Sequence, residues 1–107
     1  MGTVKICAHE MAKTPYFVEA AGIHLYSIEE LAYYLYENIY LVDDMMMEEK
    51  LYSWIEMELG MRTLAEKLRG GSETGHHVYN QVMVILKHSG YYSEREFNEL
   101  SEKIKEI

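Results

Sequence analysis

A chain of 107 residues with 49% hydrophobic residues and one proline has the size and composition of one folded domain. Its formal net charge of −8 is concentrated, because residues 27–60 hold nine acidic residues against one lysine. This acidity and the lack of a basic stripe argue against binding to nucleic acids. A single cysteine excludes an intramolecular disulfide, and neither a secretory signal nor an apolar run of about 18 residues is visible. We therefore expect a cytoplasmic protein that does not enter a membrane.

Residues 1–26 carry short apolar clusters and the only proline, and they lack a long helical stripe. A small β-hairpin is the preferred prediction, because residues 16–19 and 23–26 flank a turn in which Gly22 can adopt a positive φ. The alternative is a short helix over residues 15–21 that ends at Gly22. In both cases the segment should cap the helix that follows.

Residues 27–42 show the clearest helical pattern in the chain. Ser27 can cap the first turn, and Glu30 can reach back to the N–H of Ser27, as in a capping box. We expect Ile23 and Tyr26 to pack onto this helix start. The apolar face expected in the core consists of Ile28, Leu31, Ala32, Leu35, Ile39 and Val42.

Three tyrosines of the same helix lie away from its apolar face. Tyr33, Tyr36 and Tyr40 cluster with Glu29 on the helical wheel. One interpretation is that a neighbouring helix or the N-terminal segment covers these rings, since tyrosines bury large areas. The other interpretation is a partner-binding surface, because tyrosine is enriched at protein interfaces.

Four further helices are predicted after this one. Asp43 and Asp44 can cap the second, Gly60 can end it, and Gly70-Gly71 should stop the third. The predicted ranges are residues 45–59, 61–69, 76–88 and 93–107. The fold class is therefore mainly α: a compact bundle of about five helices in one domain, residues 1–107, with residues 1–26 as a cap and 27–107 as the bundle.

Neither a metal nor a cofactor is expected. His76 and His77 point apart on a helix, and His88 lies roughly 16 Å along it, so the three histidines cannot share one ion. Four glutamates of the second helix are interpreted as a solvated acidic face rather than as catalytic carboxylates. These are Glu48, Glu49, Glu56 and Glu58.

A second candidate site involves the N-terminal segment. Cys7 and His9 would share one face of a strand, and His24 would approach them if the N-terminal strands pair. Nucleophilic catalysis needs a nucleophile, a base within hydrogen-bond reach and a group that orients the base. Cys7 and His9 are close only in the sequence, so a structural or incidental cysteine is the favoured interpretation. This pocket would lie between the N-terminal segment and the bundle.

Residues 12–44, AKTPYFVEAAGIHLYSIEELAYYLYENIYLVDD, resemble the start of small uncharacterised bacterial proteins. Those proteins open with a TPY segment and a G-I-x-x-Y-S-I-E-E-L-x-Y-Y-L-Y-x-N-I-Y pattern, and some continue into tetratricopeptide-like helical repeats. The resemblance covers about a third of the chain. It implies either a whole small protein or a module of a larger interaction protein, and it brings no activity or catalytic residue with it.

The leading hypothesis is an interaction or adaptor domain without catalytic activity that uses Tyr33, Tyr36, Tyr40 and Glu29 to bind a protein partner. A homo-oligomer that pairs this tyrosine face with its symmetry mate is a further possibility. The alternative from another class is a small enzyme or ligand-binding domain with a pocket at Cys7, His9 and His24.

Overall fold

The computed structural model describes residues 11–42, 46–71 and 77–105, and it confirms a mainly helical fold with an N-terminal β-hairpin. The hairpin strands are β1 (Tyr16–Val18) and β2 (Ile23–Leu25). The helices are α1 (Ile28–Glu37), the 3₁₀ turn η1 (Ile39–Leu41), α2 (Glu49–Met57), α3 (Arg62–Gly71), α4 (His77–Ser89) and α5 (Glu94–Lys105).

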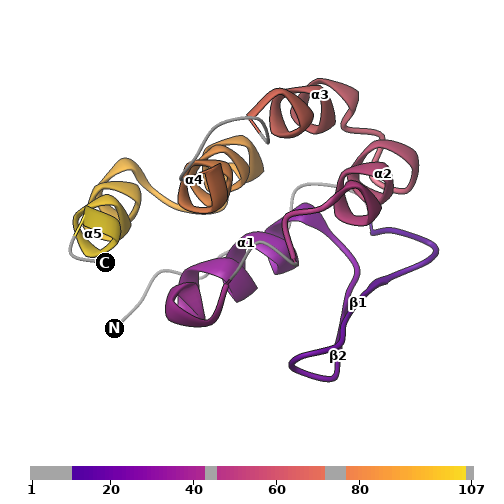
Figure 1. Cartoon of the computed structure of the whole chain (residues 1–107), viewed down its shortest axis with the longest axis horizontal. Helices are drawn as coiled ribbons and strands as arrows, with labels where there is room; N and C mark the ends of the chain where they lie inside the picture. Colours follow the sequence, from indigo (N-terminus) through magenta and orange to yellow (C-terminus); the bar gives the residue numbers. More distant parts are fainter. Residues whose placement is uncertain (1–10, 43–45, 72–76, 106–107) are drawn as a thin grey trace.

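Helices α2 to α5 follow one another in an arc, with α1 below it and the hairpin beyond α1 and α2 (Figure 1). Each helix from α2 to α5 packs against the next, and α1 also packs against α4. Most of the apolar positions expected from the helical periodicity are buried in one core cluster. Its fully buried side chains include Ile28, Leu31, Leu35, Leu51, Ile55, Leu64, Leu68, Ile85, Leu86 and Leu100.

The hairpin prediction for the N-terminal segment is confirmed, and the alternative helix over residues 15–21 is wrong. The N–H groups of Ala21 and Gly22 both donate to the carbonyl of Val18, at 3.2 and 2.8 Å. Gly22 has φ 65°, the left-handed conformation that closes a short hairpin loop without steric cost. Phe17 pairs with His24 at the centre of the two strands.

The side chains that attach the hairpin to the helices differ from those predicted. Tyr16, Val18 and Leu25 are buried, whereas Ile23 and Tyr26 remain more than a third exposed. Successive side chains alternate along an extended chain, so the inward position of Leu25 turns Tyr26 outward. Ile23 instead lines a groove that is described below.

The segment before β1 is fastened to α2. The indole Nε1 of Trp54 donates to the carbonyl of Thr14 at 2.7 Å, and the Thr14 N–H donates to the Glu58 carboxylate at 3.2 Å. The ring centroids of Tyr16 and Trp54 lie 5.7 Å apart. These contacts hold the start of the hairpin against α2.

Helix α1 begins as predicted but ends earlier. The Glu30 N–H donates to Ser27 Oγ at 3.1 Å, while the Glu30 carboxylate accepts from the N–H of Tyr26 rather than from that of Ser27. The helix ends at Glu37: the Asn38 N–H makes the last i→i−4 bond, to the Tyr34 carbonyl, and the Asn38 backbone then leaves the helical region at φ −123°. The Asn38 side-chain amide donates to the same carbonyl at 2.9 Å. The chain then forms the 3₁₀ turn η1.

The other helix boundaries are close to those predicted, with two corrections. Helix α2 begins only at Glu49, while the proposed caps Asp43 and Asp44 lie outside the described residues. Helix α3 continues to Gly71 instead of stopping at the glycine pair. Its last turn is held from outside, by the two contacts described next.

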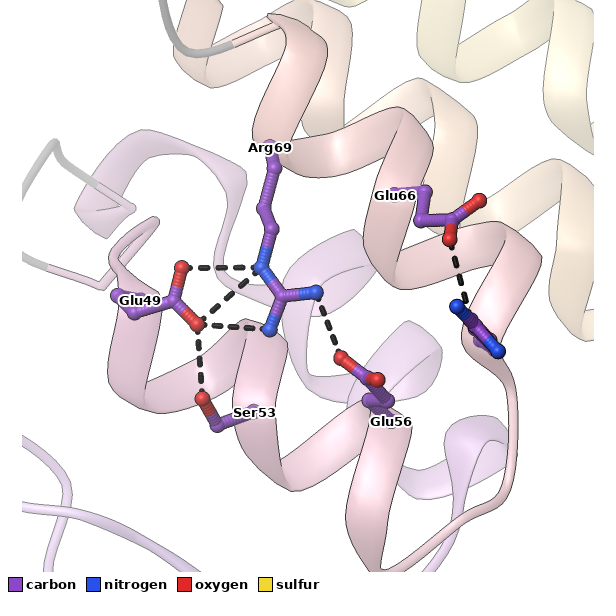
Figure 2. A network of polar contacts seen from close by, with 6 residues as sticks. Glu49, Ser53, Glu56, Glu66 and Arg69 are labelled. Atoms are coloured by element: carbon purple, nitrogen blue, oxygen red, sulfur yellow. Dashed lines mark hydrogen bonds and ion pairs between the residues drawn. The ribbon is translucent and has the colours of Figure 1, made fainter.

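Arg69 of α3 reaches across to α2 and lies between two carboxylates (Figure 2). Its Nη2 is 2.7 Å from Glu49 Oε2, and its Nη1 is 2.6 Å from Glu56 Oε1. Hydrogen bonds from Arg69 and then from Ser53 lower the pKa of Glu49 to about 2. The expected acidic face is therefore not simply solvated, because Glu49 and Glu56 bind Arg69 and Glu58 accepts from the N-terminal segment.

A buried side-chain amide in α4 connects that helix to α3 and α2. Gln81 of α4 is 2% exposed, and its Nε2 donates to the Leu68 carbonyl of α3 and to the Tyr52 hydroxyl of α2. The Tyr52 hydroxyl in turn donates to the Met47 carbonyl at 3.0 Å. Leu68 lies in the last turn of α3, where carbonyls lack intrahelical donors, so the bond from Gln81 stabilises that turn.

Candidate functional site

The hairpin and α1 enclose a groove of about 530 Å³, which we call the hairpin groove. One wall is β2, the opposite wall is α1, and Tyr91, from the α4–α5 connection, contributes to its lining. The described residues that line it are Ala21, Ile23, His24, Leu25, Glu29, Glu30, Tyr33, Tyr34, Asn38 and Tyr91. Most of them come from residues 21–38, so the groove is largely built by a short stretch of the chain.

The hairpin wall is partly apolar and partly aromatic. Ile23 is 38% exposed. The His24 ring lies 4.8 Å from the ring of its cross-strand neighbour Phe17, which limits its rotation. This wall therefore offers an aliphatic side chain and an imidazole on a hydrogen-bonded strand.

The α1 wall contributes two carboxylates and two phenol rings. Glu29 and Tyr33, and likewise Glu30 and Tyr34, are four residues apart and so are neighbours on the helix surface. Glu29 is only 2% exposed, whereas Tyr33 is 53% exposed. A desolvated carboxylate thus lies beside an accessible aromatic ring.

Tyr91 belongs to a cluster of three tyrosines, and the other two do not line the groove. Tyr91 meets Tyr92 edge to face with ring centres 5.0 Å apart, and Tyr92 stacks on Tyr36 at 4.6 Å. Burial, and then the charge of Glu37, raises the pKa of the Tyr92 hydroxyl well above its ordinary value. The hydroxyl therefore stays neutral, and the stack presents Tyr91 from a packed base.

A second hollow of about 460 Å³ lies along β1 and has a different charge pattern. Its lining includes Glu19 and Glu48 but also Lys50, whose Nζ is 5.9 Å from the centre of the Tyr16 ring. In the hairpin groove, by contrast, the described lining residues include two glutamates and neither lysine nor arginine. The hairpin groove is the more strongly acidic of the two.

The structure divides the four residues that the helical wheel placed on one face. Tyr33 and Glu29 line the hairpin groove, Tyr36 is half-buried under Tyr92, and Tyr40 is 67% exposed on η1. Two causes account for this division. Helix α1 ends before Tyr40, and the connection to α5 covers Tyr36.

Of the three residues predicted for the second candidate site, only His24 lies in the part of the chain that the structure describes. His24 lines the hairpin groove, so it lies beside Tyr33 and Glu29 of the other candidate surface. Cys7 and His9 lie outside the described residues. The residues that sequence reasoning missed are Tyr34, Asn38 and Tyr91, and only Tyr34 had a usable signal, its spacing of four from Glu30.

Two negative findings apply to residues 11–42, 46–71 and 77–105. No group of three histidine, cysteine or acidic side chains in these ranges is placed to hold a metal ion. None of the helices formed there combines the length and the apolarity that a bilayer-spanning helix needs.

The comparisons with known proteins leave the geometry as the main evidence. No protein-family model, no curated protein and no solved structure matches this chain.

Proposed function

We propose that this protein is an interaction domain that binds a protein partner in the hairpin groove. The observation that carries the proposal is the accessible ring of Tyr33, 53% exposed, at the edge of a groove that also exposes Ile23. Tyrosines in partly enclosed surfaces dominate many interfaces, because a rigid ring buries much area at little entropic cost. No chemical reaction is assigned to the site.

The fold supports this role by fixing both walls of the groove. The hairpin is held by the Trp54 contacts to Thr14 and Tyr16, and α1 is packed into the core. Preformed walls reduce the entropy that a partner loses on binding. The resemblance of residues 12–44 to segments that precede tetratricopeptide-like repeats supports the same kind of function, an interaction module in the cytoplasm.

The test compares two tyrosines that differ in position but not in chemistry. Tyr33→Ser removes the groove ring, and Tyr40→Ser removes a ring on η1 that is at least as exposed. Partners recovered with the tagged wild-type protein are identified, purified and titrated against all three proteins. We expect Tyr33→Ser to weaken binding by about 2 kcal/mol, as at an interface hot spot, and Tyr40→Ser to have little effect.

Two outcomes would contradict the proposal. Equal affinities for all three proteins would remove Tyr33 from the interface. Loss of binding only in Tyr40→Ser would move the interface to η1. A second copy of the chain counts as the partner if light scattering shows a dimer that Tyr33→Ser dissociates.

A second candidate function, binding of a small ligand, is favoured by one observation. The groove volume of about 530 Å³ lies within the range of common ligand pockets. A thermal-shift screen tests this candidate, with Tyr33→Ser as the control. Stabilisation that the variant loses supports a ligand site, and stabilisation that it keeps places the ligand elsewhere.

A further inference from the structure

We propose that the partner enters the hairpin groove as an extended segment, which adds a third strand to the hairpin antiparallel to β2. This inference rests on the proposed function, because it names the conformation and the side-chain pattern of the segment that occupies the same groove. Three features support it: the direction of the β2 backbone groups, the contrast with the β1 edge, and the side chains that an added strand would meet.

The first feature is the direction of the backbone groups along the hairpin. The N–H groups of Ala21 and Gly22 both donate to the Val18 carbonyl, so that carbonyl faces the loop and the β2 side. Successive residues of an antiparallel strand direct their N–H and C=O groups to opposite edges, so those of Phe17 point away from β2. The register pairs Phe17 with His24, whose N–H and C=O therefore point away from β1.

A contact at the end of β2 places this edge against the groove. The N–H of Tyr26, two residues after His24, donates to the carboxylate of Glu30, which lines the groove on α1. Residues 23–25 also line it in succession, as expected if the groove runs along the edge of β2 rather than over one face. Among the described residues the sheet contains only β1 and β2, so no third strand bonds to His24 there. An antiparallel strand can make both bonds to His24 with a single residue.

The second feature is that the β1 edge is less suited to a further strand. Pro15 comes directly before β1 and two residues before Phe17, so it lies at the next outward position of that edge. Proline has no N–H to donate, and a proline on an edge strand hinders pairing with another chain. The β2 edge contains no proline, so the geometry favours addition to β2.

The third feature is the set of side chains that the added strand would meet. A residue bonded opposite His24 has its side chain on the His24 face, and its two neighbours have theirs on the face of Ile23 and Leu25. Leu25 is buried, so this second face is the one turned toward the protein. There the two neighbours meet Ile23 and Tyr33, the exposed apolar groups of the groove. The expected segment therefore has apolar residues on both sides of its central residue, with backbone bonds giving affinity and the apolar pair giving specificity.

The test uses three peptides that differ only by one N-methyl group. The first is acetyl-Gly-Val-Ala-Val-Gly-amide, the second carries N-methylalanine at the centre, and the third carries N-methylvaline directly after the alanine. In the proposed pairing the alanine N–H donates to the His24 carbonyl, whereas the N–H of that valine points away from β2. We expect the first and third peptides to shift the His24 amide resonance in NMR titrations, and the second to bind roughly ten-fold more weakly.

Three variants separate the backbone of His24 from its side chain. His24→Pro removes the N–H that would donate to the added strand and should abolish binding of the first peptide. His24→Ala keeps that N–H and should leave the affinity nearly unchanged. Phe17→Pro is the matched control, because it removes the outward N–H of the opposite edge and should leave binding intact. The N-methyl comparison uses the wild-type protein, so it remains decisive even where His24→Pro perturbs the hairpin.

Three results would overturn the inference. These are no binding of the first peptide, equal binding of the first and second peptides, and loss of binding with N-methylvaline rather than with N-methylalanine. Each differs from failure of the proposed function itself. If Tyr33→Ser abolishes partner binding while N-methylalanine has no effect, the groove is the interface and only the strand addition is wrong. If the partner binds the Tyr33→Ser variant as tightly as the wild type, the proposed function is wrong.

Discussion

Replacing Gln81 with leucine should destabilise the fold strongly, although the two side chains have similar volumes. Gln81 is 2% exposed, and its Nε2 donates to the Leu68 carbonyl and the Tyr52 hydroxyl. Loss of a donor to a buried carbonyl costs about 1–3 kcal/mol, and loss of the amide–hydroxyl bond costs about 0.5–1.5 kcal/mol. We therefore expect a loss of about 1.5–4.5 kcal/mol, a large share of the roughly 5–15 kcal/mol that stabilises a typical domain.

Urea denaturation measures this loss, with the fluorescence of Trp54 as the probe of the core and circular dichroism as the probe of the helices. Trp54 is the only tryptophan and is 7% exposed. The matched control is Asn80→Leu, because Asn80 is the exposed neighbour of Gln81 on α4. It should change the free energy of unfolding by less than about 0.5 kcal/mol.

A double-mutant cycle with Tyr52→Phe isolates the bond between Gln81 and Tyr52. The cycle should give a coupling energy of about 0.5–1.5 kcal/mol, because the two groups share one buried hydrogen bond. The reasoning is refuted if Gln81→Leu unfolds at the same urea concentration as the wild type. Strict additivity in the cycle would also refute it.

Three further predictions concern the helix glycines, the Arg69 contacts and the pH dependence of the Glu49 contact. Gly60→Ala should lower the free energy of unfolding by about 1 kcal/mol, because Gly60 has φ 67°, a conformation that a residue with a Cβ adopts only with strain. No neighbouring atom would clash with the added Cβ. Gly70→Ala, within α3 and equally open, should instead stabilise by about 0.5–1 kcal/mol, and equal signs in urea unfolding would contradict this account. Arg69→Met should lower the urea midpoint more than Arg95→Met, because Arg95 is 89% exposed and Arg69 contacts two carboxylates. The stabilisation from Glu49 should be fully present above its ordinary pKa of 4.5 and be lost as the pH falls through about 2. The difference in unfolding free energy between the wild type and Glu49→Gln should therefore shrink as the pH falls from 4.5 to about 2. A difference that stays constant over this interval would contradict the prediction.

Local patterns in the sequence were sufficient for much of the fold. The cap of α1 at Ser27 and the positive φ of Gly22 depend on interactions within a few residues. The apolar stripes depend only on helical geometry. These features follow from the sequence because no distant residue is needed to form them.

The end of α1 and the last turn of α3 show where local reasoning stops. The apolar stripe continues beyond Asn38, and Ile39 is buried as expected, but the backbone of Asn38 leaves the helical region and its side-chain amide bonds to the Tyr34 carbonyl, where η1 begins. In α3 the glycine pair favours a stop, yet contacts from Arg69 and Gln81 to neighbouring helices hold the last turn. Tertiary contacts of this kind override helix propensity.

The candidate site could be anticipated only in parts. The sequence assigned Tyr33 and Glu29 to one surface and His24 to another, because a helical wheel contains no information about where the hairpin folds back. The hairpin folds beside α1, and the groove between β2 and α1 is lined by His24 together with Glu29 and Tyr33. Tyr91 comes from a position more than fifty residues away in the sequence, so no local pattern predicts it.

Photo-crosslinking in living cells tests the central claim, that the hairpin groove is the binding surface, most directly. Benzoylphenylalanine replaces Tyr33 in one protein and Tyr40 in another, and the crosslinked products are identified by mass spectrometry. The account predicts one defined partner at position 33 and no such product at position 40. A partner captured at position 40 but not at position 33 would contradict it.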